Sequence, residues 1–80
     1  GVNDRWQLVE AGATWRRRRV KELVLDGATI PDPDTVYLDA TVEIASDATL
    51  LPNVHLVGAT RIGEGAVVGP NCRIKDSVIG

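Results

Sequence analysis

Residues 38–68 read LDATVE-IASDAT-LLPNVH-LVGATR-IGEGAV-V when they are written in groups of six, and each group begins with an aliphatic residue. The aliphatic series, which continues one group further, consists of Leu38, Ile44, Leu50, Leu56, Ile62, Val68 and Ile74. A fixed short period of this kind indicates repeated units that bury their apolar side chains only by stacking on one another.

A second position recurs four residues after most of these aliphatic residues and is small or β-branched. Its members are Val42, Ala48, Val54, Thr60, Ala66 and Cys72. Three groups of six make one turn, and the parallel strands of successive turns stack about 4.8 Å apart. Both positions then point into a triangular tube. The chain is therefore predicted to be mainly β, with a left-handed parallel β-helix of hexapeptide repeats over residues 27–80.

The repeat is irregular at both ends. Asp32 occupies an aliphatic position, although Ile30 and Val36 keep the second inward position. Ile79 follows Ile74 after five residues instead of six, which predicts a one-residue deletion at a turn. The segment has room for about three turns, near the minimum for a stable stack of repeats.

Residues 4–25 are predicted to form a helix that Asn3 or Asp4 caps and that Gly27 stops. We expect Arg18 and Glu22 to pair at the i, i+4 spacing. Arg16 lies in the middle of the apolar stripe, so its head group is expected to reach outward or to meet a partner. The predicted apolar stripe consists of Trp6, Val9, Ala13, Val20, Leu23 and Val24.

Charge is divided between the two parts of the chain. Residues 1–25 carry six Lys or Arg and three Asp or Glu, a net charge of +3, whereas residues 26–80 carry three and eight, a net charge of −5. This split argues against a general nucleic-acid binder, which would show a basic stripe on its folded face. Cys72 is the single cysteine, which fits a reducing, cytoplasmic location, and no apolar run is long enough to span a membrane.

Several residues are candidates for sites, and a structural role is favoured for each. His55, the single histidine, is expected to face outward at the surface, and Cys72 is expected to pack in the core. The run Arg16–Arg19 points to four sides of a helix and so forms no single basic face. Four aspartates are candidates for a calcium site, but turn formation through bonds to the local backbone is expected to explain them. These are Asp32, Asp34, Asp39 and Asp47.

Five short segments resemble a known family. They are GVNDR at 1–5, DP at 32–33, IGEG at 62–65, VGPN at 68–71 and DSVIG at 76–80. In this order around an Arg-rich helix, they resemble the middle of the bacterial bifunctional enzymes that join N-acetylglucosamine-1-phosphate uridyltransferase to glucosamine-1-phosphate N-acetyltransferase. The resemblance covers the whole chain but only a small part of the family's length.

The resemblance implies a division of the chain and a role for one residue. Residues 1–5 would end the nucleotidyltransferase domain, residues 6–26 would be the linker helix, and residues 27–80 would be the first turns of the acetyltransferase β-helix. Asn3 would bind the sugar nucleotide and Mg²⁺, for which an amide oxygen is a suitable ligand. From the residues alone, a helix cap is an equally good interpretation of Asn3.

The family's other properties are expectations of the same kind. The resemblance implies a homotrimer in the cytoplasm that acts on glucosamine-1-phosphate, acetyl-CoA and UTP to make UDP-N-acetylglucosamine for cell-wall peptidoglycan. The remaining catalytic residues lie outside this sequence, so the 80-residue chain is expected to be inactive alone. Two alternatives remain: a non-catalytic scaffold for trimerisation, and a segment of another hexapeptide-repeat acyltransferase.

Overall fold

The computed structural model describes residues 4–80 and begins with one long helix, α1, Arg5–Leu25. Asp4 caps its start, because the Asp4 carboxylate accepts a hydrogen bond of 2.9 Å from the backbone N–H of Gln7. At its end, Ala28 N–H donates to the carbonyl of Leu23 at 3.0 Å, and Gly27 adopts a φ of 117°. This is the glycine-terminated helix end that the sequence predicts, and the helix prediction is confirmed.

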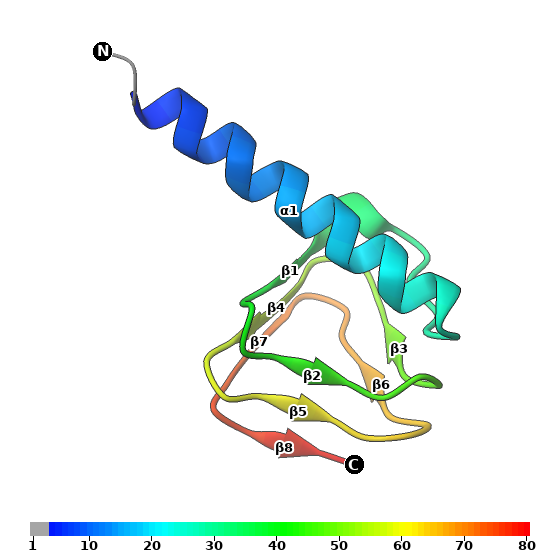
Figure 1. Cartoon of the computed structure of the whole chain (residues 1–80). Helices are drawn as coiled ribbons and strands as arrows, with labels where there is room; N and C mark the ends of the chain where they lie inside the picture. The colour runs from blue at the N-terminus through cyan, green and yellow to red at the C-terminus, as the bar shows by residue number, and fades with distance from the viewer. Residues whose placement is uncertain (1–3) are drawn as a thin grey trace.

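Short parallel strands follow the helix and form three sheets (Figure 1). A 3₁₀ turn, Pro33–Thr35, comes first. The sheets have the orders β1-β4-β7, β2-β5-β8 and β3-β6. This arrangement is consistent with a hexapeptide-repeat β-helix, called the coil below. The strands are β1 Val36–Leu38, β2 Glu43–Ile44, β3 Thr49–Leu50, β4 Val54–Val57, β5 Arg61–Ile62, β6 Val67–Val68, β7 Cys72–Lys75 and β8 Val78–Ile79.

The strand register follows the predicted turn of three six-residue groups. Leu38 pairs with Leu56, and Leu56 pairs with Ile74, so each residue lies beside the one three groups further along the chain. Between β5 and β8 the register shortens by one position, because Ile62 pairs with Ile79 instead of Gly80. The predicted one-residue deletion is therefore confirmed.

The register at the start of the coil differs from the prediction. The regular period would place Thr29 beside Asp47, but Thr29 bridges to Thr49. The next residue, Ile30, therefore lies beside Leu50 and takes the aliphatic position. Asp32, which the sequence placed there, lies in the chain leading into the 3₁₀ turn. The two extra residues are accommodated between Ile30 and β1, where Pro33 fixes a tight turn.

Most of the predicted inward positions are buried. Leu50 and Leu56 have no exposed surface, whereas Ile74 and Ile79 at the far end are only half-buried against the core. Thr60 is fully buried, and its hydroxyl donates to the carbonyl of Val57 at 2.8 Å. A buried hydroxyl with a hydrogen-bond partner avoids the cost of desolvation, so Thr60 can replace an aliphatic residue in the tube.

The predicted apolar stripe of α1 is correct only near the end of the helix. Val20 and Leu23 are buried, and Ala13 is half-buried. Trp6, Val9 and Val24 are 66%, 58% and 41% exposed, which contradicts the prediction. A helix of 21 residues is about 31 Å long, and its N-terminal half extends past the strands (Figure 1). Among residues 4–80, no helix is both long enough and apolar enough to cross a membrane.

Candidate functional site

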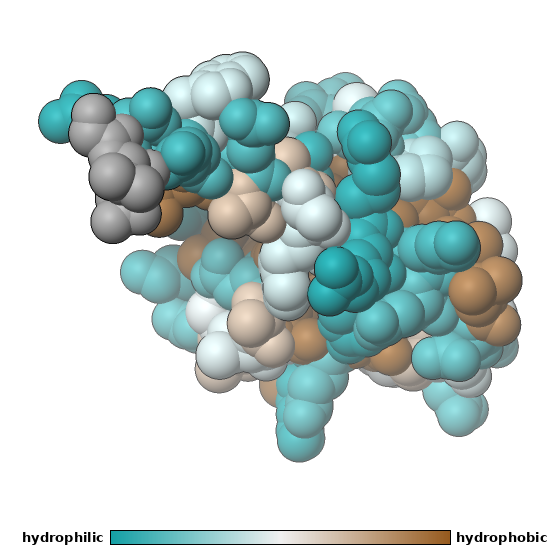
Figure 2. Space-filling view, turned by 45° about the horizontal axis from the view of Figure 1, so that its top comes forward, coloured by the Kyte–Doolittle hydropathy of each residue, from teal (hydrophilic) through white to brown (hydrophobic). Residues whose placement is uncertain are grey.

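A groove of 600 Å³ lies between α1 and the outer face of β1 and β4. Figure 2 shows apolar surface recessed between the helix and the polar side chains around it. Leu8, Val9 and Trp15 of the helix line one side of the groove, and Tyr37 and His55 of the strands line the other. The groove is therefore mainly apolar, with aromatic rings on both of its sides.

A column of stacked side chains closes one part of this groove. The guanidinium carbon of Arg16 lies 4.3 Å from the centre of the Tyr37 ring, and the rings of Tyr37 and His55 stack with centroids 4.6 Å apart and planes 12° apart. Arg16 therefore meets a partner, which is one of the two outcomes expected from the sequence. We call Arg16, Tyr37 and His55 the stacked column.

His55 faces outward, as expected, but it is half-buried because Tyr37 covers one face of its ring. An aromatic partner does not orient or activate an imidazole as a carboxylate does. The contact therefore supports the structural interpretation of His55 over a catalytic one.

Two other arginines of the run, Arg17 and Arg19, form separate contacts. Arg17 lies 3.7 Å from the exposed carboxylate of Asp34. Arg19 pairs with Glu22 at 3.7 Å, so the predicted pairing of Arg18 with Glu22 is wrong. The i, i+3 spacing also brings side chains together on a helix, and Glu22 pairs with Arg19 at this spacing instead of with Arg18. The arginines point to different sides, as predicted.

The four candidate aspartates do not group into a metal site. Within residues 4–80, no three His, Cys, Asp or Glu side chains are grouped so that they could hold a metal ion. The carboxylate of Asp39 accepts a bond of 2.9 Å from Gly58 N–H, and that of Asp76 accepts one of 2.7 Å from Ala59 N–H. Both bonds join successive turns of the coil. For Asp39, the sequence predicted a bond to the local backbone instead.

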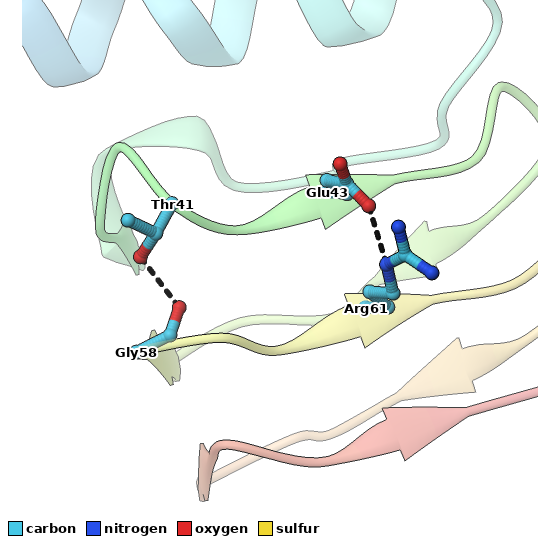
Figure 3. A network of polar contacts seen from close by, with 4 residues as sticks. All are labelled: Thr41, Glu43, Gly58 and Arg61. Atoms are coloured by element: carbon cyan, nitrogen blue, oxygen red, sulfur yellow. Dashed lines mark hydrogen bonds and ion pairs between the residues drawn. The ribbon is translucent and has the colours of Figure 1, made fainter.

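Exposed polar pairs continue this linkage along the coil. The hydroxyl of Thr41 donates to the carbonyl of Gly58 at 2.6 Å, and Nε of Arg61 lies 2.5 Å from a carboxylate oxygen of Glu43. Both contacts are drawn in Figure 3. Glu43 of β2 and Arg61 of β5 are register partners, so opposite charges occupy adjacent positions on successive turns. Cross-strand pairs of this kind favour one register.

The two other predicted site residues have different outcomes. Cys72 is half-buried, packs against the core and lies in register with buried Val54, as expected for a packing residue. Asn3 lies outside the described residues, so its roles as a cap, a substrate-binding residue or a magnesium ligand stay predictions.

Tyr37 is the site residue that the sequence interpretation missed. It occupies the position before Leu38, and His55 occupies the position before Leu56, so the two are one full turn apart and in register. The repeat contained this signal, because residues one turn apart on the outer face must lie side by side. The sequence indicated that Arg16 of the helix could have a partner, but it did not identify Tyr37 as that partner.

Comparison with known proteins gives two kinds of match. Residues 41–80 match the family described as bacterial transferase hexapeptide (six repeats). All 80 residues are 49% identical to the bifunctional protein GlmU of Geotalea uraniireducens, covering 18% of that protein. The GlmU proteins of Kineococcus radiotolerans and Caldanaerobacter subterraneus are 48% and 50% identical over the same 80 residues, which cover 16% and 18% of their lengths. The chain therefore spans less than a fifth of each of these relatives.

Proposed function

Because this chain belongs to the family of bacterial hexapeptide transferases, we propose that it is the central segment of an enzyme of UDP-N-acetylglucosamine synthesis. The whole enzyme transfers an acetyl group from acetyl-CoA to glucosamine-1-phosphate and then a uridylyl group from UTP to the product. The main support for this proposal is that the similarity to bifunctional GlmU proteins covers the helix as well as the repeats.

The proposal includes the finer organisation of the chain. Residues 1–5 end a nucleotidyltransferase domain, residues 6–26 link it to the next domain, and residues 27–80 begin a left-handed coil of about three turns. The parallel strands, with a register of three six-residue groups per turn, support the coil. The end of α1 at Leu25 supports the boundary after residue 26.

Asn3 is proposed as a ligand of Mg²⁺ and of the sugar nucleotide. Its amide oxygen is a hard donor of the kind that Mg²⁺ accepts, together with carboxylates, phosphates and water. Residues 4–80 contain no cluster of His, Cys, Asp or Glu fit to complete such a site. In the proposed enzyme, the other ligands and the acetyl-transfer residues come from segments outside the chain.

The enzyme is further proposed to be a cytoplasmic homotrimer. Val67 and Val78 lie on outer faces of the coil with 64% and 76% of their surface exposed. Burial of such side chains between flat faces would stabilise a threefold assembly by about 25 cal/mol for each Å² of apolar surface. The unpaired Cys72 is compatible with a reducing compartment.

A hybrid protein tests the proposed function. The matching 80 residues of the Geotalea uraniireducens GlmU protein are replaced by this chain, and acetyl transfer and uridylyl transfer are measured separately. We expect both activities in the hybrid. Asn3→Ala in the hybrid should reduce uridylyl transfer by about 100-fold through loss of a metal ligand and leave acetyl transfer unchanged.

The chain alone is the second arm of this test. It should acetylate no glucosamine-1-phosphate, because the acetyl-transfer residues are proposed to lie elsewhere. Acetylation by the purified chain, or a folded hybrid that lacks both activities, would contradict the proposal.

The exposed valines also favour the alternative of a trimerisation scaffold. Sedimentation of the isolated chain over a range of concentrations tests the scaffold alternative. A stable trimer supports a scaffold role, whereas a monomer at high concentration refutes it. The chain could also belong to another hexapeptide acyltransferase. That alternative does not explain why residues 1–40 are also similar to GlmU proteins.

A further inference from the structure

The N-terminal part of α1 leaves the coil without burying any of its side chains. Residues 5–12 are all exposed, and the first residues of the helix with half-buried side chains are Ala13 and Arg16. The firm packing comes later, at Val20 and Leu23. The contacts of Ala13 and Arg16 are therefore the ones that lie nearest to the exposed helix half.

The stacked column supplies that contact. Two groups cannot stack on the same face of one ring at these distances, so the Tyr37 ring lies between the guanidinium of Arg16 at 4.3 Å and the imidazole of His55 at 4.6 Å. In the fold, the helix lies on one side of β1 and β4 lies on the other (Figure 1). A ring supported on both faces has few alternative rotamers, because each would break a contact. Tyr37 is thus a fixed platform on which the Arg16 side chain rests.

The exposed ion pair next to the column cannot replace this platform. Arg17 and Asp34 are separated by 3.7 Å, and their side chains are 80% and 77% exposed. Pairs this exposed contribute little and are screened by salt. A planar guanidinium stacked on an aromatic face has a defined geometry and is attracted electrostatically by the ring.

We propose that the stacked column is a positioning device that fixes the direction in which the N-terminal half of α1 leaves the coil. Val20 and Leu23 hold the helix end on the coil, and the column suppresses rotation of the helix about that contact. In a longer protein, whatever precedes α1 would be oriented by Tyr37. The inference concerns the helix and the coil alone, and it does not rest on the proposed reaction.

The distribution of distances between two spin labels tests this inference in the full 80-residue chain. Labels are attached to cysteines that replace Gln7 on the helix and Glu64 on the coil, both exposed, in a Cys72→Ser background. The reference protein should give one narrow peak. Tyr37→Leu should increase the population outside that peak about fivefold, whereas Tyr37→Phe, which keeps an aromatic face, should change it less than about twofold.

A second pair of variants separates the column from general stability. Arg16→Gln should act like Tyr37→Leu, whereas Arg18→Gln, at a neighbouring helix position outside the column, should leave the distribution unchanged. Circular dichroism checks that each variant is folded. A narrow, unshifted peak in Arg16→Gln would overturn the inference, and so would equal broadening in Arg16→Gln and Arg18→Gln.

Discussion

Gly58 lies at a corner where residues of three successive turns meet. Its N–H donates to Asp39, its carbonyl accepts from Thr41, and its φ is 70°. A Cβ added at Gly58 would overlap the carboxylate of Asp76, which accepts the hydrogen bond from Ala59 N–H. The residue is thus constrained both by its backbone conformation and by the next turn.

Gly65 provides a matched comparison for this corner. It has the same φ of 70°, but an added Cβ would meet no atom within 4 Å. We expect Gly65→Ala to cost about 1 kcal/mol from backbone strain alone. Gly58→Ala should cost about 2 kcal/mol, because Asp76 must also give up a hydrogen bond. Urea unfolding of the two variants measures the difference, and equal losses of stability would show that the carboxylate contact is unimportant.

For α1, the sequence predicted the helix correctly but overestimated the length of the helix face that packs on the coil. The predicted stripe assumed that the whole helix packs on the coil. Val20 and Leu23 do pack there, but Trp6 and Val9 lie beyond the coil and remain exposed. Sequence periodicity identifies which side chains share a face, but it does not report how far the neighbouring element extends.

Two leucines near the helix end test this packing. Leu23 is 4% exposed and Leu25 is 75% exposed. Leu23→Ala should lower the free energy of unfolding by about 3 kcal/mol, since it removes buried methyl groups and leaves a cavity. Leu25→Ala should change it by less than about 0.5 kcal/mol. Thermal and urea unfolding give both values, and a larger loss for Leu25→Ala would place the other face of the helix on the coil.

At the scale of the whole molecule, most of the coil could be predicted because the same six-residue rule acts at every turn. The shift at Ile79 was visible as a missing residue, and the register confirms it. The shift at Ile30 was visible only as Asp32 in an aliphatic position, because no earlier turn of the repeat reveals the two extra residues that the 3₁₀ turn accommodates. The stacked column was missed because it joins the coil to an element outside the repeat.

A repeat of six residues, shortened once between β5 and β8, sets the register of the strands from β1 to β8. Nuclear Overhauser contacts between backbone protons of adjacent strands test it most directly. We expect contacts that pair Leu38 with Leu56 and Leu56 with Ile74, at the full turn, and Ile62 with Ile79, where the turn is one position shorter. Contacts that pair Ile62 with Gly80, or that join consecutive strands such as β1 and β2 as a hairpin, would contradict it.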